Sequence, residues 1–408
     1  MHSLSPNYLP NLRFNTRLLA SVIRQTLLLG AALGLAFNAC AADKIKVGML
    51  TTLSGPGAAL GVDIRDGFNL ALKHSGNKLG GLPAELVIDD DALNPDTAKQ
   101  LTDRMLKRDR VDIMTGVVFS NIMLAIGPAV FEAKTFYVSA NAGPSQYAGA
   151  QCNPYFFNVA WQNDNLHEAM GKYVADKGFK NVLILAPNYP AGKDALAGFK
   201  RFYKGKLADE MYTTLNQLDY APELAQIRAA KPDAVYIFLP GGMGINFIKQ
   251  YGQAGLTKDI PLFGPGFSGD EDVIKAVGEP MVGMFNSSQW ARDLDNAQNR
   301  RFVADFEKDY GRLPSLYASQ GYDAAMLIDA AVRDVKGRIE DKDALRKALA
   351  AANFKSVRGD FKFNRNNFPI QNYYLRQVAK DDKGRITNKL VSTIFRNQPD
   401  AYVGECKM

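Results

Sequence analysis

Apolar runs of strand length alternate with helical segments through most of this chain, and this alternation restricts the fold more than any other feature. The runs at 44–53, 85–91, 111–118 and 135–140 are each followed by a segment with helical spacing of its apolar residues. Buried parallel strands are typically continuous apolar runs, and the helices between them cover the sheet. The pattern therefore predicts a doubly wound α/β domain.

The same alternation restarts in the second half of the chain. The runs "KNVLILAPN", "DAVYIFLP" and "IPLFGPG" predict further strands, and helical segments separate them. Extended segments without helical period, such as "YFFNVAWQND", join the two halves at more than one place. The sequence therefore predicts an α/β protein of two interwoven, Rossmann-like lobes with a cleft between them.

The N-terminal segment has the features of a targeting sequence. Arg13, Arg17 and Arg24 precede the apolar run from Thr26 to Phe37, and small residues follow it. A basic region, a short apolar region and a small-residue end predict a secretory signal peptide, assigned to residues 1–42. The apolar run is too short to cross a bilayer. We therefore expect an exported, periplasmic protein, with lipid attachment at Cys40 as an alternative.

The net charge and the cysteine content indicate which molecules the protein binds and whether it contains a disulfide. The formal net charge is +7, and loss of the three signal-peptide arginines would leave about +4, which gives no indication of nucleic-acid binding. Cys152 and Cys406 would then be the remaining cysteines. Two cysteines in an oxidising compartment are candidates for a disulfide. Two unrelated thiols are the alternative.

Few side chains in the sequence are arranged for catalysis or metal binding. His2 lies in the predicted signal peptide, and His74 and His167 are expected at polar edges of helices. The glycines of 54–61 do not have the spacing of a dinucleotide-binding fingerprint. The acidic run 89–91 is interpreted as a turn at a strand end. The sequence therefore predicts no enzyme, no cofactor and no metal site.

Two strand ends, "GVVFSNIM" and "VSANAGPS", carry the residues of the predicted binding site. Ligands of open α/β sheets bind beyond the carboxyl ends of the strands. Ser120 begins a predicted helix, and the first N–H groups of a helix attract anions. If the strands are neighbours, Ser120, Asn141 and the N–H groups of Ala142 and Gly143 meet at one carboxylate. A Ser120 that only caps its helix is the alternative.

Trp161 and Trp290 both lie in predicted joins between the lobes. Either tryptophan packs the hinge or contributes an aromatic wall to the cleft, and the sequence leaves both interpretations open.

Four segments, in this order, resemble the type I periplasmic solute-binding proteins of the branched-chain or hydrophobic amino acid uptake family. They are "VGMLTTLSGPGAALG", "YVSANAGP", "PNYPAGKDALAGF" and "ASQGYDAAMLI". The resemblance covers residues 44–408. It implies two lobes joined by three crossovers, a small-molecule ligand enclosed between them, and delivery by a monomeric carrier to an ABC permease. The lobes are assigned as 43–160 plus 287–358, and 161–286 plus 359–408.

The resemblance also implies roles for individual residues. Ser120 matches the carboxylate-binding serine of the family, and the segment "ANAG" matches its small-residue loop. Tyr189 matches an aromatic residue that closes over the ligand from the second lobe. Gly241 and Phe267 fall where later loops of that lobe reach the cleft.

The strand end departs from the amino-acid binders of the family, which usually carry "AAT" or "AST" there. Asn141 precedes Ala142, and Gly143 stands near the threonine position. An α-ammonium group also needs a carboxylate partner, for which Asp270 and Glu271 are the nearest candidates.

The variant "SANAGPS", together with Phe119, Trp161 and Trp290, is similar to the subgroup that takes up aromatic acids. One anion site suits a carboxylate, and aromatic walls suit a ring. The sequence therefore predicts a carrier of an aromatic acid of the benzoate or hydroxycinnamate type. A branched-chain amino acid or amide carrier, and a ligand-sensing domain of the same fold, are the alternatives.

Overall fold

The structure, a computed structural model, describes residues 42–408, which form one compact unit. The predicted signal peptide, apart from Ala42, lies outside the described residues, and so does Cys40. Within the described part, no helix has the length and apolar character needed to cross a membrane.

The first lobe is built on a 6-stranded sheet in the order β2-β3-β1-β4-β5-β6. The pairs among β1, β3, β4, β5 and β6 are parallel, and β2 pairs antiparallel with β3. The strands are β1 (Ile45–Thr51), β2 (Lys78–Leu79), β3 (Leu82–Asp90), β4 (Ile113–Thr115), β5 (Phe136–Ser139) and β6 (Phe156–Asn158).

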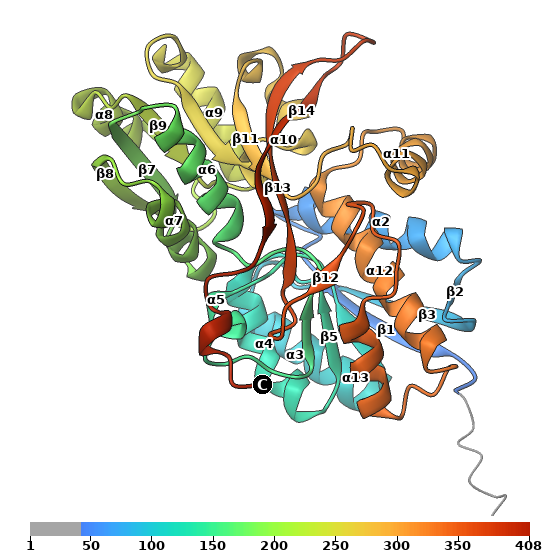
Figure 1. Cartoon of the computed structure of the whole chain (residues 1–408). Coiled ribbons are helices and arrows are strands. Elements are labelled where there is room, and N and C mark those ends of the chain that lie inside the picture. The colour runs from blue at the N-terminus through green and yellow to red at the C-terminus, as the bar shows by residue number, and fades with distance from the viewer. Residues whose placement is uncertain (1–41) are drawn as a thin grey trace, which may run out of the picture. The chain divides into compact units, whose positions relative to one another are not determined.

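Helices cover both faces of this sheet, with α12 packed along α2 and α3 packed against α4 (Figure 1). The helices are α2 (Ala58–His74), α3 (Pro95–Arg104), the π-helical turn η1 (Met105–Asp109), α4 (Ser120–Glu132), α5 (Ser145–Ala148), α11 (Ala297–Tyr310), α12 (Leu316–Asp334) and α13 (Lys342–Ala351). Asn94 caps α3 by accepting from the N–H groups of Asp96 and Thr97, because the first helical N–H groups have no partner inside the helix.

The second lobe contains an 8-stranded sheet in the order β12-β13-β11-β10-β9-β7-β8, with β14 paired to β13. The five strands from β7 to β11 are parallel, and β13 and β14 run antiparallel at the edge. The strands are β7 (Asn181–Pro187), β8 (Lys206–Thr213), β9 (Ala234–Ile237), β10 (Leu262–Pro265), β11 (Phe285–Ser288), β12 (Lys362–Phe363), β13 (Pro369–Lys380) and β14 (Ile386–Gln398). The second sheet thus extends through Ser288, slightly beyond the predicted boundary at 286.

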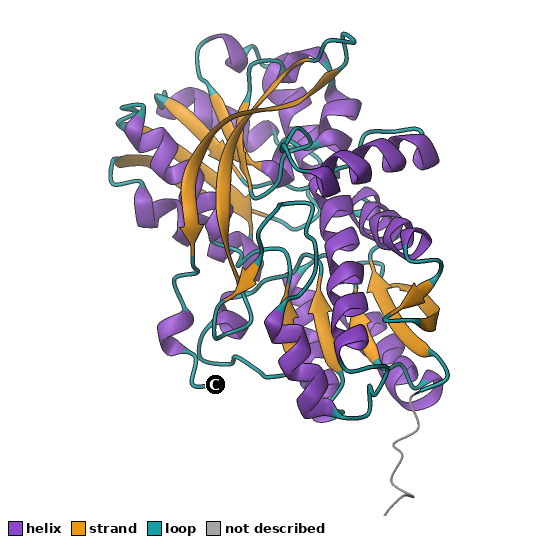
Figure 2. Ribbon diagram, turned by 45° about the vertical axis from the view of Figure 1, so that its right-hand side comes forward, coloured by secondary structure: helices purple, strands orange, loops and turns teal. Residues whose placement is uncertain are grey.

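Helices also surround the second sheet (Figure 2). They are α6 (Asn165–Asp176), α7 (Pro190–Phe202), α8 (Ala221–Ala230), α9 (Gly242–Gln253) and α10 (Glu271–Val277), with short 3₁₀ turns η2 (Leu256–Lys258), η3 (Gly266–Ser268), η4 (Glu279–Met281) and η5 (Val403–Glu405). Both lobes therefore have the predicted doubly wound α/β architecture.

The chain passes between the lobes in three crossovers, which connect β6 to α6, β11 to α11 and α13 to β12. A buried arginine links the third of them to the first and to α12. Arg358, in the third crossover, contacts Asp323 of α12 at 3.0 Å, and both side chains are almost fully buried. The same guanidinium donates to the backbone carbonyls of Val159 and Ala160 in the first crossover. Arg358 therefore fixes the first and third crossovers against α12.

The C-terminal tail leaves the second sheet and returns to the first lobe near α5 (Figure 1). Cys406 forms a disulfide with Cys152, and their Cα atoms are 5.6 Å apart. The side chain of Asn366 also donates to Asp400 in the tail and to the carbonyl of Ala148. The disulfide closes a loop that includes the whole second lobe.

We predict that the Cys152→Ser/Cys406→Ser double variant is less stable by roughly 2–5 kcal/mol, because the cross-link restricts a long loop of the unfolded chain. Urea unfolding of the oxidised wild type and the double variant would measure the difference. A reducing agent should lower the wild-type midpoint and leave that of the double variant unchanged. Equal midpoints for the two oxidised proteins would contradict the prediction.

The end of the first crossover carries a buried cluster of acids. Asp164 and Glu168 both contact the guanidinium of Arg201, and the hydroxyl of Tyr402 donates to Asp164 at 2.9 Å. Burial, and then the nearby charge of Asp194, raise the pKa of Asp164 to about 7. One guanidinium cannot balance all of these carboxylates, so a proton on Asp164 stabilises the fold.

We predict that Asp164→Asn reduces the loss of stability that occurs as the pH rises. Between the ordinary aspartate value of 3.8 and about 7, the folded chain holds a proton that the unfolded chain has lost, so stability falls as pH rises through this window. Thermal unfolding from pH 4 to pH 8 should show the variant gaining relative to wild type over that window. Asp103→Asn, on the exposed side of α3, is the matched control. A pH-independent difference would contradict the assignment.

Candidate functional site

The site lies where the carboxyl ends of strands from both sheets meet. In the first lobe, β4 leads to Ser120 and β5 leads to Asn141. In the second lobe, β7 leads to Tyr189, β9 to Phe238 and β10 to Phe267. The strand ends of a parallel sheet leave free backbone groups and space between the following helices.

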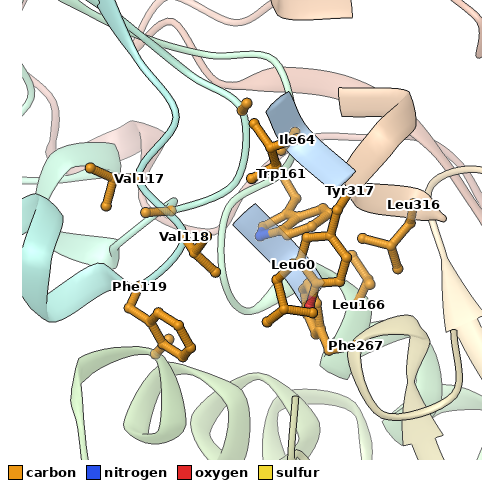
Figure 3. Close-up of a cluster of buried hydrophobic side chains, with 14 of the residues drawn as sticks. Leu60, Ile64, Val117, Val118, Phe119, Trp161, Leu166, Phe267, Leu316 and Tyr317 are labelled. Atoms are coloured by element: carbon orange, nitrogen blue, oxygen red, sulfur yellow. The ribbon is translucent and has the colours of Figure 1, made fainter. Parts of the chain in front are cut away.

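A cavity lies between these loops, and about 20 Å³ of it is open to the centre of a water molecule. It is lined by Leu60, Val118, Phe119, Ser120, Asn141, Trp161, Asn163, His167, Tyr189, Ala191, Phe238, Pro240, Phe267 and Tyr317. Figure 3 shows Trp161, Tyr317 and Phe267 gathered beside Leu60, with Phe119 placed apart from them.

Ser120 is oriented by an asparagine that the sequence interpretation did not identify. The Asn163 side chain donates through Nδ2 to Ser120 Oγ at 3.0 Å and to Asp194 Oδ2 at 2.9 Å. Because Ser120 Oγ accepts from Asn163, its own hydrogen is free to donate. Ser120 is also the first residue of α4, which has no side-chain cap. Its hydroxyl and the first N–H groups of α4 therefore form a set of donors for an anion.

Asn141 lines the cavity, but its side chain is used differently from the prediction. Its Nδ2 group donates to the carbonyl of Val118 at 2.6 Å. Its Oδ1 atom is buried and has no hydrogen-bond partner in the described residues. An amide oxygen accepts hydrogen bonds and repels a carboxylate, so Asn141 offers an acceptor to the cavity.

Ala142 and Gly143 do not line the cavity and lie behind it. The N–H of Ala142 donates to the carbonyl of Val117, and the N–H of Gly143 donates to Asn163 Oδ1 at 3.1 Å. Their N–H groups are therefore occupied within the protein, in contrast to the predicted contact with a carboxylate. Gly143 instead positions Asn163, and through it Ser120.

Aromatic rings form a continuous lining from one lobe to the other. Phe119 of the first lobe lies 6.2 Å from Tyr189 of the second, centroid to centroid, and Tyr189 lies 6.2 Å from Phe238. Phe267 lies 5.4 Å from Phe238 and contacts Trp161 edge-to-face at 4.5 Å. Phe119, Tyr189 and Phe267 are thus brought together as the sequence predicts, and Trp161 forms part of the cavity wall.

Two other predicted residues lie elsewhere. Trp290 is buried away from the cavity, where its Nε1 group donates to Asn299 and its ring packs on Phe302, so it has a packing role in the first lobe. Gly241 has a φ of +58°, a conformation that favours glycine, and it lies beside the carbonyl of Pro56 in the opposite lobe. The neighbouring N–H of Gly242 donates to that carbonyl at 3.0 Å.

The two acids considered as partners for an ammonium group are also outside the cavity. Asp270 pairs with buried Arg376 and accepts from the N–H of Leu316. Glu271 accepts from the side chain of Thr387. The cavity lining contains no acidic side chain, no lysine and no arginine.

The expectation that His167 lies at a polar helix edge is wrong. Its side chain is 1% exposed and lines the cavity, with its ring 4.9 Å from that of Phe238. Burial lowers the pKa of His167 to about 3, so the imidazole is neutral. His167 stands among polar residues in the sequence, so the sequence gives no sign that its side chain is buried. The apolar run at 233–240 supplies Phe238, one of the rings beside it.

Comparison with known proteins places the chain in a family. The family described as periplasmic binding protein matches residues 44–384. The solute-binding protein of an ABC transporter from R. palustris, solved in complex with benzoate, is 33% identical with a TM-score of 0.85, covering 90% of this chain and 100% of that chain. A second, from Rhodopseudomonas palustris BisB5 in complex with 3,4-dihydroxy benzoic acid, is 30% identical with a TM-score of 0.81, covering 88% and 99%.

A Brucella melitensis protein named Leu/Ile/Val-binding protein homolog 6 is 29% identical over 381 residues, which are 91% of this chain and 96% of that protein. The chain therefore belongs to the periplasmic binding protein family. It is a solute-binding protein of the ABC-transporter class, and its fold is that of non-enzymatic carriers. The predicted family and two-lobed α/β fold are confirmed.

We predict that Gly143→Ala destabilises the protein by roughly 1–3 kcal/mol and weakens ligand binding. An added Cβ would lie 2.2 Å from the Trp161 carbonyl oxygen and 2.8 Å from Asn158 Nδ2, so the first crossover, which carries Trp161 and Asn163, must shift. Urea unfolding and calorimetric titration would measure both effects.

Gly252→Ala in α9 is the matched control, because a Cβ there meets nothing within 4 Å and the change should stabilise the helix by about 0.5–1 kcal/mol. If Gly143→Ala unfolds and binds ligand like wild type, the prediction is contradicted.

Proposed function

We propose that this protein is an exported carrier that binds an aromatic carboxylic acid, of the benzoate or hydroxycinnamate type, between its lobes and delivers it as a monomer to an ABC permease in the inner membrane. The predicted signal peptide would direct it to the periplasm. The observation that carries the proposal is the chemistry of the cavity lining, which combines a helix end with free donors, several aromatic rings and no acidic side chain.

The helix end suits the carboxylate of such a ligand. The Ser120 hydroxyl, oriented by Asn163, and the first N–H groups of α4 converge on one side of the cavity. Hydrogen bonds to an ionised group are stronger than those between neutral groups, and the helix dipole adds to them. This arrangement holds a carboxylate without a basic side chain.

The rings suit the rest of the ligand. Phe119, Tyr189, Phe238, Phe267 and Trp161 surround the space on several sides. Aromatic pairs favour edge and offset contacts at separations like those among these rings. The solved relatives from R. palustris hold benzoate and 3,4-dihydroxy benzoic acid, which supports the same ligand class here.

Closure of the lobes fits a carrier mechanism. Across the cleft, Ser145 of α5 donates to Asp194 of α7 through its hydroxyl at 2.7 Å, and the N–H of Gly242 donates to the carbonyl of Pro56. These bonds form only when the lobes are together. A ligand that contacts both lobes therefore stabilises the closed arrangement, and hinge motion at the crossovers would release it.

A branched-chain amino acid is the second candidate ligand. The Oδ1 atom of Asn141, which has no partner in the described residues, offers one acceptor for an ammonium group, and the Brucella melitensis relative is named a homolog of a Leu/Ile/Val-binding protein. An ammonium group in such a cavity nevertheless favours a carboxylate partner, and the lining has none.

We predict that benzoate- or cinnamate-type acids stabilise residues 43–408 against thermal unfolding after refolding has removed bound ligand. At 100 times its dissociation constant a ligand contributes about 2.7 kcal/mol, which raises the midpoint by a few degrees. Leucine, isoleucine and valine form the second panel. A shift with these amino acids alone would overturn the aromatic assignment.

Ser120→Ala tests the carboxylate site within the same prediction. Loss of a hydrogen bond to a charged group should weaken binding of the aromatic acid by roughly tenfold to a hundredfold. Ser75→Ala, at the end of α2, is the control and should bind like wild type. Adding Asn141→Ala to Ser120→Ala should weaken binding no further, because Asn141 Nδ2 already donates to the carbonyl of Val118. A double variant that binds like wild type would exclude this part of the cavity.

A further inference from the structure

One polar pair of the second lobe has no role in the carboxylate site. His167 of α6 and Tyr236 of β9 are both buried, at 1% and 0% exposure. The hydroxyl of Tyr236 is the hydrogen-bond partner of His167 Nδ1, and the two rings meet edge-to-face with centroids 6.0 Å apart. Among residues 42–408, Nδ1 is the only side-chain or backbone partner of that hydroxyl.

The hydrogen-bond geometry selects one tautomer of the imidazole. Burial raises the pKa of Tyr236 well above its ordinary value, so its hydroxyl keeps its hydrogen. If Nδ1 carried the imidazole hydrogen, the Tyr236 hydroxyl would be a buried donor without an acceptor, which is costly. Tyr236 therefore donates to Nδ1, and the hydrogen of the neutral imidazole lies on Nε2.

The Nε2–H group has no protein partner in the described part of the chain, and the ring lines the ligand cavity. His167 comes from the second lobe, beside Phe238 and Phe267, whereas Ser120 comes from the first lobe. A ligand whose carboxylate is at Ser120 therefore lies in the same cavity as His167.

We infer that the Nε2–H group of His167, held by Tyr236, donates a hydrogen bond to an oxygen on the ring of the bound acid, so that the protein prefers ring-hydroxylated aromatic acids to unsubstituted ones. This inference rests on the proposed function, because it assumes an aromatic acid in the cavity. It assigns His167 as a specificity-determining residue and Tyr236 as its positioning residue.

The first test compares ligands on the wild-type protein by calorimetric titration. The set is benzoate, its 2-, 3- and 4-hydroxy derivatives, and the matching aminobenzoates. At least one hydroxybenzoate should bind about tenfold more tightly than benzoate. The aminobenzoate of the same shape should bind no better than benzoate, because an aromatic amine is a good donor and a poor acceptor. Equal preference for the amine would show that Nε2 is an acceptor and would overturn the inference.

The second test uses variants. His167→Phe and Tyr236→Phe should each reduce the preference for the hydroxylated acid to within about twofold, with a smaller effect on benzoate. His167→Gln, which keeps an N–H donor, should restore part of the preference. If His167→Phe does not fold, Tyr236→Phe alone carries the test, since it removes one oxygen from the buried pair. An unchanged preference in the folded variants would overturn the inference.

A matched control exists in the first lobe. His74 also contacts a tyrosine, Tyr322, through Nδ1 at 2.9 Å, but this pair lies outside the cavity. His74→Gln should leave both affinities unchanged. If His74→Gln also loses the preference for the hydroxylated acid, the losses in the His167 and Tyr236 variants reflect general destabilisation, and the inference is overturned.

Nitrogen-15 NMR of the imidazole provides a readout that is independent of affinity. The His167 signal should show a protonated Nε2 and an unprotonated Nδ1 in the free and bound protein. A hydrogen on Nδ1 would overturn the tautomer assignment. If wild type binds no aromatic acid but binds leucine, the proposed function itself fails, whereas equal binding of benzoate and all hydroxybenzoates contradicts only the inference about His167.

Discussion

The buried ion pair between Arg358 and Asp323 holds together the segments that connect the two lobes. The guanidinium of Arg358, in the third crossover, also donates to the carbonyls of Val159 and Ala160, so one side chain satisfies groups from the first crossover and from α12. Removing one member of such a pair leaves an uncompensated buried charge and typically costs about 3–5 kcal/mol. Because the crossovers determine where the strand ends of the two sheets meet, the geometry of the cavity depends on this contact.

The side chain of Asn163 connects the crossovers to the ligand site. Its amide accepts from the N–H of Gly143 and donates to Ser120 and Asp194, which come from the first and second lobes. The orientation of the Ser120 hydroxyl is therefore coupled to the approach of α7. On this view, anion binding and lobe closure support each other, because the donor set is complete only when both lobes are in contact.

Much of the fold could be predicted because its determinants are local. Apolar runs and helix signals such as Asn94 lie within single elements, and they placed most of the parallel strands and the helices between them. The long antiparallel strands β13 and β14 were not predicted. Ser120 was predicted from its strand end, whereas Phe119, Tyr189 and Phe267 were implied by the family resemblance, and all four line one cavity. The sequence left open whether Trp290 lines the cleft or packs the hinge, and the structure places it on Phe302, away from the cavity. The prediction for His167 was wrong, because helical periodicity does not distinguish a polar residue facing solvent from one facing a cavity.

The sequence by itself determined the two α/β lobes and which kinds of side chain follow each strand, because strand and helix formation depend on neighbouring residues. It also determined a helix end at Ser120 suited to an anion. Only the tertiary structure decided which polar atoms remain free. Asn141 Nδ2 is occupied by Val118, and the N–H of Gly143 is occupied by Asn163. Such partners come from segments distant in the chain, so their hydrogen bonds exist only once the lobes and crossovers have packed.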